Sequence, residues 1–108
     1  MTVYSVGYYP EADDEYWRLP PRLKKELQSR LNYLKAGPFR SYPEVHVKEV
    51  DDVPGAWRFH LRHYRVFYRV DGLVIWVVMI WEDRPSAYSK STLREDRRRM
   101  RQGSSPPL

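Results

Sequence analysis

One stretch, residues 57–88, restricts the possible folds of this 108-residue chain more than any other. It reads WRFHLRHYRVFYRVDGLVIWVVMIWEDRPSAY. Large apolar residues first alternate with basic ones, which is the pattern of a strand with one buried and one exposed face. Asp71-Gly72 then favours a tight hairpin turn, because these residue types accept a positive φ. The stretch therefore predicts antiparallel strands near 56–61, 64–70 and 73–81.

The alternation also predicts which residues share a face of these strands. A tight turn at residues 62–63 would pair Leu61 with Tyr64. It would also set His60 opposite Arg65, and a four-residue loop would leave the faces unchanged. One face is then apolar, and it comprises Trp57, Phe59, Leu61, Val66, Tyr68, Val70, Leu73, Ile75, Val77 and Met79. The other face carries the cations, and it comprises Arg58, His60, Arg62, Arg65, Phe67, Arg69, Val74, Trp76, Val78 and Ile80.

The two predicted faces suggest different roles. The apolar face is expected to pack against helices. Cations above an aromatic floor, on the other face, suit the binding of phosphates and the stacking of bases. The alternative is that these cations are solvated side chains that keep an exposed strand surface from aggregating.

The charge of the chain is concentrated in its second half. Residues 55–108 contain eleven Lys or Arg and five Asp or Glu, a net charge of +6, whereas residues 1–54 contain eight and nine, a net charge of −1. A basic half favours a polyanionic partner such as nucleic acid or an acidic protein.

The rest of the chain predicts one compact domain. A short strand near 3–8 precedes a helix that starts at Pro10 and ends before Pro20-Pro21. A clearer helix follows and stops at Gly37-Pro38, and a strand is expected at 45–50. The apolar stripe of the second helix consists of Leu23, Leu27, Leu31 and Leu34.

Beyond the meander, Thr92 and Glu95 form a capping-box pattern that predicts a short helix near 92–102. We expect an α+β fold with two N-terminal helices packed on an antiparallel four- to five-stranded sheet and a short C-terminal helix. The domain would span residues 1–102, and residues 103–108 would form a disordered tail.

Cysteine usage and hydropathy indicate the compartment. The chain has no cysteine, so no disulfide framework or thiolate metal site is expected. Its start lacks the pattern of a signal peptide, and its longest apolar run, residues 73–81, is too short to span a bilayer. These features predict a cytoplasmic protein without a membrane partner.

At this point the sequence resembles a known family. The pattern Trp57-Arg58-x-His60-x-x-x-Tyr64-Arg65-Val66-x-Tyr68, followed by Arg84-x-x-x-Tyr88, is similar to that of the RelE/ParE toxin superfamily. The resemblance covers about residues 3–90. It implies the α+β fold above and a toxin of a type II toxin–antitoxin pair. In the RelE branch, it implies a ribosome-dependent endoribonuclease that cleaves mRNA by attack of the ribose 2′-OH, without a metal or other cofactor.

The resemblance also implies roles for individual residues. Arg65 matches the arginine expected to stabilise transition-state charge, and Arg84 would be a second cation. Tyr88 would stack on a base or assist proton transfer, and His60, which titrates near neutral pH, would be the acid or base. Additional RNA contacts are expected from Arg58, Arg62, His63, Arg69 and Trp76. His60 and His63 lie on opposite faces of a strand, so they are not expected to bind a metal together.

Two departures from the family pattern leave alternatives open. Arg62-His63 replaces a turn that often contains Gly, which favours a wider turn. Glu82-Asp83 replaces an expected basic residue, so Glu82 is a candidate base, or else it marks a weak nuclease or a ParE-like gyrase inhibitor. Besides a nuclease and a gyrase inhibitor, a third alternative is a generic basic module that binds nucleic acid. The expected partners are the ribosome, mRNA and a cognate acidic antitoxin.

Overall fold

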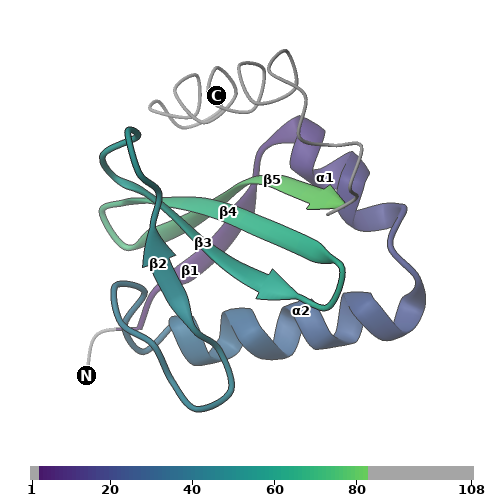
Figure 1. Cartoon of the computed structure of the whole chain (residues 1–108), viewed down its shortest axis with the longest axis horizontal. Helices are drawn as coiled ribbons and strands as arrows, with labels where there is room; N and C mark the ends of the chain where they lie inside the picture. The colour runs from purple at the N-terminus through teal and green to yellow at the C-terminus, as the bar shows by residue number, and fades with distance from the viewer. Residues whose placement is uncertain (1–2, 83–108) are drawn as a thin grey trace.

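A computed structural model describes residues 3–82 as two helices and five strands (Figure 1). The elements in chain order are β1 (Ser5–Tyr8), α1 (Pro10–Trp17), α2 (Pro21–Leu34), β2 (Val47–Glu49), β3 (Ala56–Leu61), β4 (Tyr64–Asp71) and β5 (Val74–Glu82). The predicted C-terminal helix near 92–102 and the predicted tail lie outside the described residues. Within residues 3–82, no helix is long and apolar enough to span a membrane.

The strands form one mixed sheet in the order β1-β5-β4-β3-β2. β2 to β5 are antiparallel neighbours, whereas β1 runs parallel to β5. The expectation of a fully antiparallel sheet is therefore wrong at one edge. The reason is topological: the two helices after β1 carry the chain across one face, so that β1 meets the last strand rather than the next one. Residue patterns carry no signal for such a non-sequential pairing.

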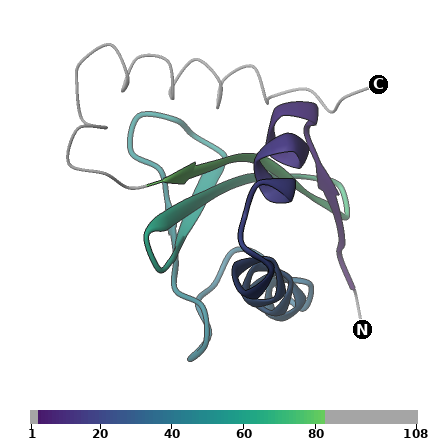
Figure 2. The same ribbon diagram turned by 90° about the vertical axis from the view of Figure 1, so that its right-hand side faces the viewer.

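Both helices begin with a proline, whose fixed φ suits the first helical turn and whose missing N–H needs no partner there. α2 lies across one face of the sheet, as the edge-on view in Figure 2 shows. Its stripe is buried as predicted at Leu27, Leu31 and Leu34, which are at most 3% exposed. These side chains pack with Phe59 and Tyr68 of the sheet in the main core.

A buried hydrogen bond joins the sheet to the loop after α2. The hydroxyl of Tyr68 donates to the carbonyl oxygen of Pro38 at 2.6 Å. Tyr68 is fully buried, and burial raises the pKa of its hydroxyl well above the usual range. This tyrosine of the family-like pattern therefore has a structural role.

The turn between β3 and β4 is tight. Leu61 pairs with Tyr64 and His60 with Arg65, as the register from the alternation predicted. The expectation of a wider turn is wrong, because Arg62 adopts a φ of 54° and so takes the left-handed conformation that glycine usually supplies. The turn between β4 and β5 was predicted at Asp71-Gly72. It lies one residue later, at Gly72 and Leu73, because Asp71 pairs with Val74.

A β-bulge changes the faces of β5. Tyr68 pairs with Val77 and Phe67 with Met79, so that Val78 is an extra residue opposite one step of β4. From this point the alternation is inverted. Ile80 packs in the main core and Met79 packs on the other face with Phe67, which is the reverse of the prediction for these two residues.

Candidate nucleic-acid-binding site

The face of the sheet that turns away from α2 carries five basic side chains from three strands. We call this set the cationic face, and its members are Lys48, Arg58, His60, Arg65 and Arg69. Cross-strand pairing places Lys48 opposite Arg58 and His60 opposite Arg65. Directly opposed residues have Cβ atoms about 4.5–5.5 Å apart, so these four side chains can contact one bound anion.

His60 lies in hydrogen-bonding distance of its neighbour on β3. The Nη1 atom of Arg58 lies 3.3 Å from Nε2 of His60. A guanidinium only donates hydrogen bonds, so Nε2 can take part in this contact only as an acceptor. His60 is exposed to solvent. The geometry therefore presents an imidazole beside two arginines, Arg58 and Arg65.

Arg65 lies at the centre of this arrangement, between His60 on β3 and Trp81 on β5. It is half-buried, and its Nε atom is inaccessible to solvent. Beneath it is a small apolar cluster on the same face, which contains Phe67 and Met79. Such surroundings fix the guanidinium and lower the local dielectric, so that its charge acts more strongly on a bound anion than it would in water.

Arg69 and Trp76 lie at the opposite end of the face. Arg69 lies four positions after Arg65 along β4, about 13 Å away in an extended strand. The Arg69 guanidinium lies over Gly55, whose φ is 85° and where an added Cβ would come within 3.1 Å of Nη2. The Trp76 ring covers Gly7 of β1 so closely that a Cβ at Gly7 would lie 2.5 Å from it. Arg69 and Trp76 thus each pack against a glycine at this end of the face, and both stay partly exposed.

Arg62 is not brought to the cationic face, although the alternation placed it there. It lies in the β3–β4 turn, and its guanidinium donates to both carboxylate oxygens of Glu26 on α2, at 2.7 Å from Nη2 and 2.9 Å from Nε. The hydrogen bond from Arg62 is the main reason that the pKa of Glu26 is lowered from its usual value. His63 is an exposed residue of the same turn.

Glu82 is also directed away from Arg65, since the bulge places it opposite Tyr64 rather than on the cationic face. It lines a pocket of about 220 Å³ on the helix side, together with Tyr64, Ile80, Glu15, Arg18 and Leu19. Glu15 of α1 accepts a hydrogen bond from the backbone N–H of Ile80 there. This placement argues against Glu82 as the base beside His60 and Arg65.

Sequence reasoning missed Lys48 and Trp81. Lys48 belongs to a three-residue strand, and the irregular connection at 50–55 conceals its register with β3. Trp81 reaches the cationic face only because of the bulge at Val78, which no pattern in the sequence marks. The predicted site residues Arg84 and Tyr88 lie outside the described residues. Within residues 3–82, no three His, Asp or Glu side chains gather to hold a metal ion.

The fold is that of RelE-like toxins. A mutant of the E. coli toxin RelE in its free state superimposes with a TM-score of 0.67 at 20% identity, over 90% of this chain and 97% of that one. The toxin in the archaeal RelE–RelB complex of Pyrococcus horikoshii gives 0.65 at 20% identity, over 79% and 99%. The YoeB/ParE toxin of Agrobacterium tumefaciens gives 0.62 at 19% identity, over 72% and 96%.

A sequence comparison identifies the family. Residues 8–85 match the model of the ParE toxin of the type II toxin–antitoxin system parDE. This match covers most of the chain, so the chain belongs to the ParE toxin family, within the RelE/ParE superfamily of type II toxins. No curated protein sequence matches it significantly.

Proposed function

We propose that this toxin is an endoribonuclease that cleaves mRNA on the ribosome. The observation that carries the proposal is the placement of His60 beside Arg58 and opposite Arg65. Cleavage of RNA by its own 2′-OH needs a base for that hydroxyl and cations for the charge that develops on phosphorus. In this proposal His60 is the base, and Arg58 and Arg65 are the cations.

The residues divide the reaction between them. An RNA phosphate that binds Arg58 takes up its donors, which frees Nε2 of His60 to accept the proton of the 2′-OH. The 2′-oxygen then attacks phosphorus, and the bond to the 5′-oxygen breaks, which leaves a 2′,3′-cyclic phosphate. Arg65 stabilises the negative charge of the pentavalent intermediate. The 5′-oxygen leaves as a hydroxyl after protonation, a step that Tyr88 is predicted to assist, whereas Arg84 is predicted to be a second cation for the phosphate charge.

Trp81 and Lys48 would complete RNA binding. Trp81 lies next to Arg65 and offers an aromatic surface for a base. Lys48, opposite Arg58, extends the positive charge to the β2 edge of the sheet, where the next phosphate of the strand would be held. Arg62 is left out of this site because Glu26 binds its guanidinium.

A gyrase inhibitor is the second candidate function, because the family model that matches is that of a ParE toxin. The two functions differ in the target and in the residues that they need. Inhibition of gyrase requires no base, so His60 would have no chemical role. The nuclease proposal assigns that histidine the role of the base.

We also propose an acidic antitoxin as the partner. Matching structures include toxins bound to their antitoxins, such as the RelE–RelB complex of P. horikoshii. The net charge of +6 in residues 55–108 favours an acidic binding partner. We therefore expect the neighbouring reading frame to encode a small acidic protein, and its absence would count against such a pair.

Two matched histidine variants test the proposed chemistry. Purified toxin is added to ribosomes that carry a defined mRNA, and new 5′ ends are mapped. We expect cleavage with 5′-hydroxyl ends, little cleavage of naked RNA, and a rate at least about 100-fold lower for His60→Gln. His63→Gln, in the turn three residues away, should cleave at close to the wild-type rate.

Three results would refute the nuclease. They are the absence of cleavage by the wild type on ribosomes, equal rates for His60→Gln and the wild type, and toxicity that appears only as trapped gyrase with DNA breaks. Strong salt-sensitive binding to free RNA without cleavage on ribosomes would instead support a generic basic module.

A further inference from the structure

The turn between β3 and β4 has an unfavourable residue at its first central position. Arg62 has a φ of 54°, whereas the φ of His63, the second central residue, is not positive. A positive φ at the first position alone is the pattern of a type II′ turn, in which glycine is preferred there because it has no Cβ. An arginine at this position therefore needs a compensating interaction if the turn is to stay tight.

The side chain of Arg62 makes such an interaction. Its Nε donates to Oε2 of Glu26 at 2.9 Å and to Oε1 at 3.2 Å, and its Nη2 donates to Oε1 at 2.7 Å. A contact of a guanidinium with both carboxylate oxygens fixes direction as well as distance. These hydrogen bonds are also the main reason that the pKa of Arg62 is raised and the pKa of Glu26 is lowered.

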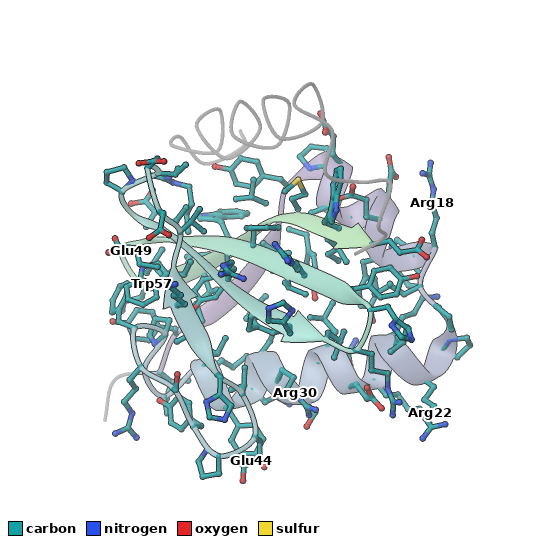
Figure 3. The ribbon with its side chains drawn as sticks, viewed as in Figure 1. Arg18, Arg22, Arg30, Glu44, Glu49 and Trp57 are labelled. Carbon is teal, nitrogen blue, oxygen red and sulfur yellow. The ribbon has the colours of Figure 1, made fainter. Side chains whose placement is uncertain are left out.

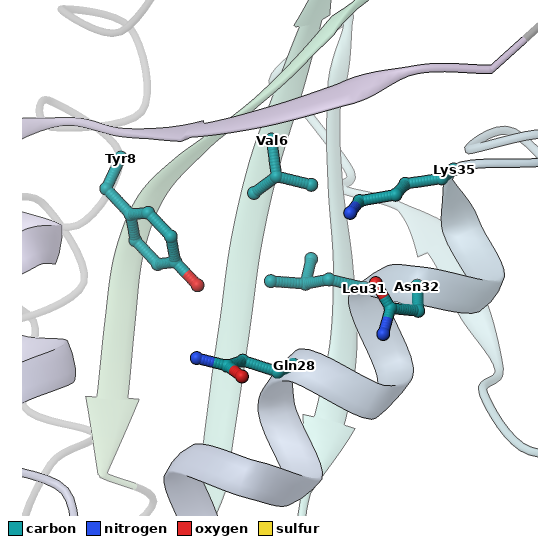
Figure 4. A pocket seen from close by; sticks show the side chains of 6 residues that line it. All are labelled: Val6, Tyr8, Gln28, Leu31, Asn32 and Lys35. Atoms are coloured by element: carbon teal, nitrogen blue, oxygen red, sulfur yellow. The ribbon is translucent and has the colours of Figure 1, made fainter.

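The helix that carries Glu26 is a fixed support. Leu27, the next residue of α2, is fully buried in the main core. Leu31 is buried there as well, and Figure 4 shows it facing Val6 of β1. The contact between Glu26 and Arg62 therefore ties the tip of the β3–β4 hairpin to a helix that is itself packed on the sheet.

The tip of the hairpin determines how His60 faces Arg65. Leu61 and Tyr64 close the turn, and His60 and Arg65 are the next pair. After a two-residue turn this second pair is a close, non-hydrogen-bonded one, with Cα atoms about 4.5 Å apart. Because only one pair separates it from the turn, the alignment of His60 with Arg65 is among the first to be lost when the turn opens.

We propose that Glu26 and Arg62 form a clamp that takes the place of a turn glycine and thereby holds His60 opposite Arg65. Both are positioning residues, since neither belongs to the cationic face. Without the clamp the turn opens part of the time, and the imidazole and the guanidinium lose their alignment. Such misalignment slows the chemical step and leaves substrate binding nearly unchanged. The inference rests on the proposed function only for the reaction that the aligned pair serves.

The alternative is an incidental surface ion pair, because exposed pairs usually contribute little to stability. The two interpretations differ in how they depend on the residue type at the turn. Glycine adopts a positive φ without help, so the substitution Arg62→Gly should make Glu26 dispensable. An incidental pair predicts no link between Glu26 and the geometry of the turn.

Four proteins test the clamp: the wild type, Glu26→Ala, Arg62→Gly and the variant with both substitutions. Cleavage of mRNA on ribosomes gives kcat and KM for each. We expect kcat to be about 5-fold lower for Glu26→Ala, with KM unchanged. Arg62→Gly and the double variant should both cleave within about 2-fold of the wild-type rate, because glycine needs no clamp.

Arg22→Ala is the matched control on the same helix. Nε of Arg22 lies 3.9 Å from Oε1 of Glu26, and Figure 3 shows the Arg22 side chain pointing away from the sheet. The substitution removes a second cation near Glu26 but leaves the contact with Arg62. The control should therefore cleave within about 2-fold of the wild-type rate.

Nuclear Overhauser contacts in NMR spectra give a readout that needs no cleavage. The Hα protons of a non-hydrogen-bonded pair lie close together, so the wild type should give a strong contact between those of His60 and Arg65. This contact should weaken in Glu26→Ala. It should return to wild-type strength in the double variant, in which the turn no longer depends on the clamp.

The outcomes separate the clamp from the nuclease. An equal loss of kcat from Glu26→Ala with and without Arg62→Gly would overturn the clamp, as would an undiminished contact between His60 and Arg65 in Glu26→Ala. Normal cleavage by Glu26→Ala, beside a wild type that cleaves, refutes the clamp alone. If the wild type does not cleave on ribosomes, the nuclease is refuted and the NMR contact alone decides on the clamp.

Discussion

The two faces of the sheet are made from the same strands but differ in the type and burial of their side chains. On the face towards α2, Phe59, Val66 and Tyr68 are at most 1% exposed and pack with the leucines of α2. On the opposite face, neighbours of these residues in the chain are Arg58, Arg65 and Arg69, and none of the three is fully buried. One face therefore maintains the fold, and we propose that the other binds an anion.

The largest expected effect comes from adjacent residues of β3 that belong to different faces. Phe59→Ala should lower the free energy of unfolding by about 3–5 kcal/mol, because it leaves a cavity in the core. Arg58→Ala should change it by less than about 1 kcal/mol. Urea denaturation of both variants measures the difference. Similar losses would show that the faces do not differ in this way.

Tyr68→Phe is expected to have the next largest effect. Loss of the hydroxyl leaves the carbonyl of Pro38 without this buried hydrogen bond, which should cost about 1–3 kcal/mol. Tyr33→Phe, at a tyrosine that is 40% exposed, is the control and should be nearly neutral. Both are measured by the same denaturation. A neutral Tyr68→Phe would refute the structural role of this tyrosine.

The variant Gly7→Ala tests whether the two ends of the cationic face, at Trp76 and at His60, have different roles. A Cβ at Gly7 meets the Trp76 ring, so the variant should lose about 1–3 kcal/mol of stability. Its cleavage rate per folded molecule should be unchanged, because Trp76 is packed at the end away from His60. A selective loss of cleavage without a loss of stability would return Trp76 to the proposed RNA-binding site.

The smallest expected effect is that of the Glu26–Arg62 ion pair on the exposed turn. Arg62 lowers the pKa of Glu26 below 4.5, so the pair stabilises the folded state at a pH above that value. This stabilisation is lost as the pH falls through the lowered pKa. The wild type should therefore exceed Glu26→Gln in thermal midpoint near pH 7 but not in strong acid. Glu44→Gln, in a loop, should show no such pH-dependent difference.

Much of the fold could be predicted from local patterns. The alternation in β3 and β4 gave the register of His60 with Arg65, and the leucine spacing gave α2. The parallel pairing of β1 with β5 was not predictable, because it depends on where the helices carry the chain. The bulge at Val78 also left no trace in the sequence. It exchanged the faces of Met79 and Ile80, brought Trp81 to Arg65 and turned Glu82 away from it.

The arrangement of side chains on the cationic face was therefore predicted where it depends on alternation and missed where it depends on the tertiary structure. His60, Arg65 and Arg58 came together as expected. Arg62 did not, because a turn residue with a positive φ projects its side chain outside the alternation and towards α2. Lys48 was overlooked because the register of a three-residue strand across an irregular loop is set by packing, not by sequence.

The most direct test of the account is the ribosome-dependent cleavage rate of Arg65→Gln, measured together with its free energy of unfolding. Arg30→Gln, on the outer side of α2, is the matched control. The account predicts at least about 100-fold slower cleavage by Arg65→Gln, with stability changed by less than about 1 kcal/mol and a control that cleaves normally. Wild-type cleavage by Arg65→Gln, or a loss of cleavage fully explained by unfolding, would contradict the assignment of the cationic face as the working surface of this toxin.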